Sequence, residues 1–235
     1  MTKNKSFSIS VFFPCHNEQD NVERVTRQAL DVLKDVSTDF EVIIVNDGST
    51  DKTAAVADRL ARENPDVKVI HHQVNRGYGA ALQSGFHAAA KDWVFYTDGD
   101  GQFDIKELPP LLDLTDKYDI VTCYRINRQD PPLRKLNAWA WGKLVCFLFN
   151  LKIKDIDCAF KLYRREIFDK IEMYSRGALI DTEILARAQR AGYRLVQRGV
   201  HHYPRLAGRQ SGANLRVILR AFKELFQLRK KILSD

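Results

Sequence analysis

The segment DGDGQ (residues 98–102) holds the side chains of this 235-residue chain that are best suited to binding a cation. Asp98, Asp100 and Gln102 alternate directly after the apolar run WVFYT, and alternate residues of an extended segment point the same way. Their oxygen atoms suit Mg²⁺ or Mn²⁺, which would bridge to a diphosphate. A turn with solvated acids has the same composition. The preceding hydrophobic run favours the metal site.

A second polar cluster, VNDGSTD, follows the apolar run EVII. Ser49 and Asp51 offer side-chain oxygens that cap the helix expected after them. Asp47 is not needed for that cap, so we assign it to a ribose or base contact.

The segment NRGYGAAL contains two glycines but lacks the third glycine of the dinucleotide fingerprint G-x-G-x-x-G. The motif therefore does not support a function in hydride transfer. Gly77 and Gly79 instead indicate a tight turn. Arg76 beside them is suited to face a phosphate. The chain has no G-x-S-x-G nucleophile motif and no Walker A motif.

The segment GALIDTEILARA places Asp181 and Glu183 at the opening of a predicted helix. Acids in a first turn interact favourably with the helix dipole. One of them serves equally well as a general base if the acceptor is an alcohol. The sequence is compatible with both a helix-stabilising role and a catalytic role for these acids.

Short strand patterns at residues 8–13, 41–46, 67–73, 93–97 and 119–123 alternate with helical patterns at residues 22–34, 53–62, 80–90 and 105–112. This alternation predicts an α/β fold with a parallel sheet covered by helices. Ligands of such sheets bind at the carboxyl ends of the strands. The clusters HNE, DGSTD, NRGYG and DGDGQ all fall at those ends.

The second half begins with a basic loop, RINRQDPPLR, and an apolar helix with Trp139 and Trp141. A helix near residues 179–191, a strand at 195–200 and a final helix at 214–233 complete it. We expect residues 1–212 to be the catalytic domain and 213–235 an amphipathic helix of the same domain. Its apolar and basic sets suit a membrane interface, although a core-packed helix shows the same stripe.

The net charge of +7 favours a polyanionic partner such as a phosphate-bearing substrate or an anionic membrane surface. The aromatic residues lie in apolar runs, so we expect no nucleic-acid partner. The four cysteines are scattered, which indicates free thiols in a reducing compartment. With no signal peptide and no run of 18 apolar residues, we expect a cytoplasmic protein, peripheral on the cytosolic face of a membrane.

Four motifs, FFPCHNEQDNV, VNDGSTDKT, NRGYGAAL and TDGDGQFD, together resemble the inverting family 2 glycosyltransferases of the GT-A fold. Within that family the chain is most similar to the polyprenyl-phosphate branch, which includes the dolichyl-phosphate mannose and glucose synthases. The resemblance implies a mostly parallel, Rossmann-like central sheet covered by helices, with C-terminal amphipathic helices. It spans roughly residues 8–214.

The resemblance also implies a UDP- or GDP-sugar donor and a divalent cation, Mg²⁺ or Mn²⁺, that neutralises charge on the leaving nucleotide. Asp98, Asp100 and Gln102 are the implied ligands, with Asp100 also counted as catalytic. The donor-binding residues implied are Pro14, His16, Asn17, Glu18, Asp47, Gly48, Ser49, Asp51, Arg76, Gly77, Asp98, Arg205, Arg209 and Ser211. The acceptor phosphate is expected at Arg125, Arg134 and Lys161.

The chain departs from the family pattern at several positions. Cys15 and His16 stand where many members have Thr or Tyr, and Ala138 stands where a hydroxyl residue can hold the acceptor phosphate. The usual G-x-S-K after the last strand reads GRQSGAN, without the lysine. These changes concern the acceptor more than the donor.

The nature of the acceptor follows from its charge. A phosphate monoester has a second pKa near ~6, so its oxygen is already a charged nucleophile at neutral pH and needs cations rather than a base. The basic second half favours a polyprenyl phosphate. The alternatives are a saccharide hydroxyl acceptor with Asp181 or Glu183 as base, and a non-catalytic basic protein that binds a membrane surface.

Overall fold

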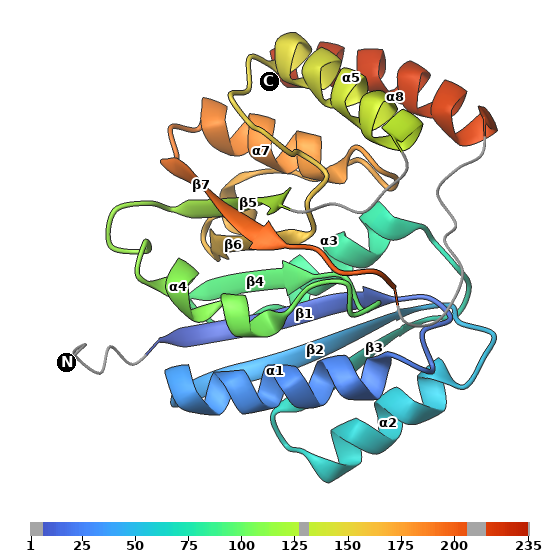
Figure 1. Ribbon diagram of the computed structural model, residues 1–235, viewed down its shortest axis with the longest axis vertical. Coiled ribbons are helices and arrows are strands. Elements are labelled where there is room, and N and C mark those ends of the chain that lie inside the picture. Colours follow the sequence, from blue (N-terminus) through green and yellow to red (C-terminus); the bar gives the residue numbers. More distant parts are fainter. Residues whose placement is uncertain (1–6, 127–131, 206–214, 235) are drawn as a thin grey trace.

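The computed structural model describes residues 7–126, 132–205 and 215–234, without side-chain detail at 132–134, 215–223 and 233. A central sheet lies between helical layers (Figure 1). The described part of the chain contributes seven strands in the order β3-β2-β1-β4-β6-β5-β7. They are β1 (Ser8–Cys15), β2 (Asp39–Asp47), β3 (Val67–His72), β4 (Trp93–Thr97), β5 (Ile120–Ile126), β6 (Phe160–Arg164) and β7 (Leu195–His201).

The helices cover both faces of this sheet. In Figure 1, α1 and α2 lie in front of the sheet and α3 lies behind it. This placement follows from right-handed crossovers, because the chain steps outward from β1 to β3 and then returns to β4. The helices are α1 (Val22–Val36), α2 (Thr53–Glu63), α3 (Tyr78–Ala88), the 3₁₀ turn η1 (Ile105–Glu107), α4 (Pro109–Leu112), α5 (Pro132–Phe149), α6 (Ile167–Lys170), α7 (Ile180–Arg190) and α8 (Leu215–Ser234).

The strands with continuous apolar runs form the centre of the core. Residues 42–45 of β2 are fully buried, and every residue of β4 is buried. A strand covered on both faces reads as such a run, without alternation. Aromatic rings fill the space between β1, α3 and β4: Phe12, Phe86 and Tyr96 pack edge-on or stacked at centroid distances of 4.8–5.6 Å.

The mostly parallel α/β sheet expected from the sequence is confirmed, with one addition. Strand β6 lies antiparallel between β4 and β5, in a segment that the sequence analysis left without a strand. It places Lys161 opposite Tyr96 on β4 and opposite Thr122 on β5. The short helix α6 was also not predicted. The remaining strands all pair in parallel, so their carboxyl ends share one edge of the sheet.

Helices α5 and α8 lie side by side at one end of the molecule, next to α7 (Figure 1). Leu225, Leu228 and Ile232 of α8 are buried, and Arg229 donates a hydrogen bond from Nε to the Leu148 carbonyl of α5 at 3.1 Å. The apolar stripe of α8 therefore packs, at least in part, against the protein. Among the described helices, none is long and apolar enough to cross a membrane.

The contact between α3 and β1 leaves no room for a methyl group at Gly85, whereas the surface of α5 at Gly142 has room for one. A Cβ on Gly85 of α3 would lie 2.2 Å from the Phe12 ring, so we expect Gly85→Ala to cost about 1–3 kcal/mol of stability through overpacking. Gly142 of α5 meets nothing within 4 Å, and Gly142→Ala is the control, with about 1 kcal/mol gained from helix propensity. Urea unfolding of both variants measures the difference, and equal effects would contradict the packing described.

Candidate functional site at the carboxyl edge of the sheet

The turn that follows β4 is pressed against the end of β1. A Cβ on Gly99 would lie 2.5 Å from the Cys15 Sγ atom and 2.8 Å from the Pro14 carbonyl oxygen, so only glycine fits between Asp98 and Asp100. Gly101 has a φ of 71°, and the Arg24 guanidinium fills the space beside it. This close approach fixes both carboxylates at the shared carboxyl edge of the central strands.

Asp98 and Asp100 lie in surroundings that disfavour their negative charge. Burial, and then the charge of Asp100, raises the pKa of Asp98 to about 7. Burial also raises the pKa of Asp100, although Arg205 and Arg24 act against it. The Tyr78 hydroxyl donates a hydrogen bond to Asp98 Oδ1 at 3.1 Å. Two carboxylates held together in this way form a strong site for positive charge.

Arg205, from the segment after β7, supplies part of that positive charge. Its guanidinium forms an ion pair with Glu18 and lies 3.8 Å from Asp100 Oδ2. Glu18 is 8% exposed and also accepts a hydrogen bond from Asn21 at 2.7 Å. The Arg205 guanidinium thus links the segments that follow β1, β4 and β7 through its charge. Glu18 and Arg205, which the sequence predicts to bind the donor, lie beside the acid pair.

The predicted ligand Gln102 is near the acids but its amide nitrogen faces elsewhere. Its backbone N–H donates to Asp100 Oδ1 at 3.0 Å, and its Nε2 donates to the Tyr203 carbonyl at 3.0 Å. In the described part of the chain, no three His, Cys, Asp or Glu side chains form a metal cluster. Two carboxylates with an amide oxygen still fit Mg²⁺, because this ion is usually held by one or two carboxylates, waters and substrate phosphates.

Asp47, expected at a ribose or base, holds a turn of the protein. It is 4% exposed, and its carboxylate accepts hydrogen bonds from the backbone N–H groups of Arg76 at 2.8 Å and Gly77 at 2.9 Å. His72 Nδ1 donates to it at 2.6 Å. Three of roughly four acceptor positions are therefore used. The contact between Asp47 and His72, which lie on two different strands, was not predicted from the sequence.

The polar residues after β2 interlock with those after β1. Asp51 accepts a hydrogen bond from the Thr53 N–H at 2.9 Å, as predicted for the start of α2. Burial raises the pKa of Asp51, but the hydrogen bonds from Thr53 outweigh it and hold that pKa below its usual value. Ser49 does not cap α2: its hydroxyl accepts from the Asn17 N–H at 3.0 Å. That part of the prediction is wrong.

Two glycines of this edge are required by backbone geometry. Gly48 has a φ of 62°, and a Cβ there would lie 2.3 Å from the Asn75 nitrogen. Gly77 has a φ of 96°, and its N–H is bound by Asp47. The side chain of Arg76 is exposed beside this turn, and His16 is exposed with Nδ1 donating to the Asp47 carbonyl at 2.9 Å. Pro14 is half-buried.

A separate cavity of about 200 Å³ opens between the end of β5 and helix α5. Arg125 lines it, and its guanidinium donates from Nε and Nη2 to Asp155 at 2.7 and 2.8 Å. A guanidinium has five N–H donors, so three remain for a ligand. The other residues lining the cavity are Tyr124, Lys135, Ala138, Trp139, Gly142, Lys143, Cys146, Ile153, Lys154, Asp155, Ile156 and Asp157.

Asp155 and Asp157 are acidic residues of this cavity that were not predicted from the sequence. Asp157 is exposed to solvent and lines the cavity. Desolvation by the cavity walls, followed by the charge of Asp181, raises its pKa to about 6. The only sequence signal was an acid shortly before β6, in a segment whose mixed composition gave no clear element.

Asp181 and Glu183 are not placed to act as catalytic bases. Asp181 is 3% exposed and accepts hydrogen bonds from Tyr96 and from Lys161, the latter at 2.7 Å. Glu183 is fully buried and accepts from the backbone N–H groups of Tyr174 and Ser175 at 2.9 and 2.7 Å. Both acids hold the interior together. This corrects the prediction of a base at either position.

Lys161 is likewise not at a surface where an acceptor phosphate can reach it. It is fully buried, and its ammonium donates to Tyr96, Asp181 and the Ile156 carbonyl. An ammonium has three donors, so none remains for a phosphate. Its prediction as a direct phosphate contact is therefore wrong. Of the other predicted residues, Arg209 and Ser211 lie outside the described residues, and Arg134 lies in α5 without a described side chain.

The comparison with known protein families decides the identity of the chain. Residues 10–172 match the model of Glycosyl transferase family 2, which is more than half of the sequence. The chain belongs to this family. The matched range contains the ends of β1 to β5, the acid pair and the cavity beside α5.

Curated relatives include Glycosyltransferase AglD of Haloferax volcanii, 32% identical over 84% of this chain and 33% of its own length. An undecaprenyl-phosphate 4-deoxy-4-formamido-L-arabinose transferase of Enterobacter sp. is 29% identical over 93% of this chain and 67% of its own. Dolichyl-phosphate beta-glucosyltransferase ALG5A of Trichomonas vaginalis is 31% identical over 81% and 64%. The family 2 chain thus spans between a third and two thirds of these relatives' lengths.

Solved structures share the fold. Mannosyl-3-phosphoglycerate synthase from Rubrobacter xylanophilus superposes with a TM-score of 0.72 at 17% identity, over 97% of this chain and 74% of the other. Glucosyl-3-phosphoglycerate synthase from Mycobacterium tuberculosis, in complex with Mn²⁺, UDP and phosphoglyceric acid, superposes with a TM-score of 0.68 at 18% identity, over 97% and 76%. The GT-A architecture expected from the sequence is confirmed.

The raised pKa of Asp98 predicts that the charged form of this carboxyl lowers the stability of the folded protein. The Asp98 carboxyl has a pKa of about 7 in the folded protein and about 3.9 in an unfolded chain. Between those values the folded state binds the proton more tightly, so the free energy of unfolding falls as pH rises from about 4 to about 7. We expect Asp98→Asn to lack this decline and to melt several degrees above the wild type at about pH 8.

Thermal melts of both proteins across this pH range measure the effect. Asp169→Asn is the control, because Asp169 is an exposed acid paired with Arg165 at 2.6 Å, away from the site. If the melting temperature of Asp98→Asn changes with pH in the same way as that of the wild type, the pKa of Asp98 is not raised in the folded protein.

Proposed function

We propose that this chain transfers a sugar from a nucleotide-sugar donor to a polyprenyl phosphate, with inversion at the anomeric carbon and with the help of Mg²⁺ or Mn²⁺. The observation that carries the proposal is the pair of sites at one sheet edge: a buried acid pair at β4 and a cation-lined cavity at β5 and α5. Relatives named for transfer to undecaprenyl and dolichyl phosphate support the choice of acceptor.

The donor is proposed to bind across the ends of β1, β2 and β4. A divalent cation there would be held by Asp98, Asp100 and the amide oxygen of Gln102, and would neutralise charge on the departing nucleoside diphosphate. Arg205 lies within reach of Asp100 and provides a second positive charge for the diphosphate. The structural neighbour crystallised with Mn²⁺ and UDP supports this arrangement.

The acceptor phosphate is proposed to bind in the cavity lined by Arg125, Lys135 and Lys143. One of its oxygens attacks the anomeric carbon as the bond from that carbon to the diphosphate oxygen breaks, so the sugar is inverted. The attacking oxygen is already ionised near neutral pH, with a second pKa near about 6. The cations that line the cavity position it and reduce its repulsion by the donor. No side chain has to remove a proton from it.

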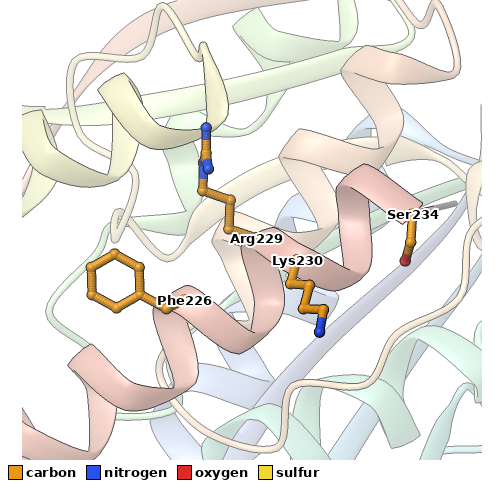
Figure 2. Close-up of a pocket in the computed structure, with 4 residues that line it drawn as sticks. All are labelled: Phe226, Arg229, Lys230 and Ser234. Carbon is orange, nitrogen blue, oxygen red and sulfur yellow. The ribbon is translucent and has the colours of Figure 1, made fainter.

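A membrane-facing surface is proposed on α5 and α8, close to the acceptor cavity. Leu136, Trp139 and Phe147 of α5 are 58%, 61% and 83% exposed, and Phe226 of α8 is 59% exposed. Phe226 lies in a surface pocket with Arg229, Lys230 and Ser234 (Figure 2). Exposed aromatic and basic side chains together suit an anionic lipid interface. The lipid acceptor would then reach the cavity from the bilayer, on the cytosolic face.

The proposed reaction is tested by radiolabelled transfer from a panel of UDP- and GDP-sugars with Mn²⁺. Farnesyl phosphate serves as acceptor, and farnesol, its alcohol counterpart, as the comparison. We expect product with farnesyl phosphate alone, and a loss of about a thousandfold in Asp100→Ala, since several kcal/mol of charge stabilisation is removed. Asp169→Ala, at an exposed ion pair, should keep wild-type activity.

Transfer to farnesol, or to a saccharide hydroxyl in place of farnesyl phosphate, would contradict the proposed acceptor class. Equal activity of Asp100→Ala and the wild type would contradict the proposed cation site.

The membrane surface is tested by sedimentation with vesicles that contain phosphatidylglycerol. We expect the wild type to bind, and the double variant Trp139→Ser/Phe147→Ser to bind about thirtyfold more weakly, because each of the two rings contributes on the order of 1 kcal/mol when partly inserted. Val74→Ser is the control, since Val74 is 67% exposed but lies in the loop after β3. If Val74→Ser weakens binding as much as the double variant, the surface has been placed wrongly.

A further inference from the structure

Lys161 is the only lysine among the buried residues of the described chain, and it joins three segments. Its ammonium donates to the Tyr96 hydroxyl of β4 at 2.9 Å, to Asp181 of α7 at 2.7 Å and to the Ile156 carbonyl at 3.0 Å. Tyr96 stands two residues before Asp98, and Ile156 stands one residue before Asp157. The Lys161 ammonium therefore contacts a residue close to the acid pair and a residue close to the acceptor cavity.

Core stability alone is a weak reason for this arrangement. Burying an ion pair carries a large desolvation cost, and well-packed apolar residues often stabilise a core equally well. An apolar side chain at position 161 would fill the same space, but it would leave the Ile156 carbonyl without a donor. The distinct contribution of the ammonium is its hold on the backbone of residues 155–157.

Residues 155–157 form one wall of the acceptor cavity. The Asp155 carboxylate binds the Arg125 side chain at 2.7 and 2.8 Å, and also accepts from the Arg125 backbone N–H at 3.2 Å. Asp157 faces the same cavity. A shift of this wall would move Asp155 and, with it, the Arg125 guanidinium. The Ile156 side chain is 2% exposed in the core, and in the described part of the chain the hydrogen bond to its backbone carbonyl comes from Lys161.

We propose that Lys161 is a positioning residue of the acceptor site: through the Ile156 carbonyl it holds residues 155–157, and through Asp155 the Arg125 guanidinium, in the geometry that binds the acceptor phosphate. This inference rests on the proposed function. It replaces a direct contact with the phosphate by an indirect one. A misplacement of about 1 Å in such a wall is enough to weaken binding or catalysis strongly.

The competing explanation is that Lys161 serves only to neutralise Asp181. The two explanations separate in the charge-balanced double variant Lys161→Met/Asp181→Asn, which removes both charges and keeps the interior filled. If the charge pair is all that matters, this variant behaves like the wild type. If the carbonyl contact matters, it folds but binds the acceptor poorly. Asp181→Asn alone keeps the lysine and its bond to Ile156.

The test is calorimetric titration with farnesyl phosphate, with farnesol as comparison, and with UDP and GDP plus Mn²⁺ to report the donor side. We expect the double variant to bind farnesyl phosphate at least about tenfold more weakly than the wild type. Nucleotide affinity should stay within about twofold in the double variant, and farnesyl phosphate affinity within about twofold in Asp181→Asn. A loss confined to the acceptor is something that a general loss of stability does not produce.

Lys68→Met is the matched control, because Lys68 also pairs with a buried acid, Glu41, at 2.6 Å, but on β3. It should lower the melting temperature without changing the affinity for farnesyl phosphate. Wild-type acceptor affinity in the double variant would overturn the inference, and so would an equal loss in an Asp181→Asn protein whose thermal melt shows that it is folded. If the wild type itself does not prefer farnesyl phosphate to farnesol, the proposed function fails as well.

Discussion

The repulsion between two carboxylates at the end of a buried strand determines much of what surrounds them. Asp98 and Asp100 are held together because the glycine between them is pressed against β1, and their pKa values rise as a result of burial. Three other elements approach this charge: Arg24 from α1, Tyr78 from α3 and Arg205 from the segment after β7. Two buried carboxylates in such surroundings favour the binding of a cation, and the cation in turn can bind a diphosphate.

The remaining interior acids have protein partners, and this limits the chemistry. Asp47 holds the turn before α3, Asp181 is bound by Lys161 and Tyr96, and Glu183 holds the backbone before α7. None of these three is placed to remove a proton from a sugar hydroxyl, which leaves Asp157 in the acceptor cavity as the candidate base for such an acceptor. An acceptor that carries its own negative charge avoids this requirement. A phosphate is such an acceptor, and the cavity at β5 and α5 offers the cations that it needs.

The sequence was sufficient for the parallel sheet and for the polar residues at its edge, because continuous apolar runs and turn-forming clusters are local signals. It was insufficient for β6, an antiparallel strand that carries a buried lysine and pairs with residues far away in the chain. The roles of Asp181 and Lys161 were misjudged, and the protein partners of Asp47 were not predicted, for the same reason. A charged residue in a sequence looks available for a ligand until its partner on another element is known.

In the proposed reaction the acceptor, and not the protein, supplies the negative charge of the nucleophile. The most direct test is the acid limb of the pH profile of kcat/KM, measured with farnesyl phosphate and with the corresponding phosphonate, whose second pKa is higher. We expect the limb to move to higher pH with the phosphonate, following the second pKa of the acceptor. A limb that stays in place with both acceptors would contradict this, and would indicate a protein base such as Asp157, whose pKa is about 6.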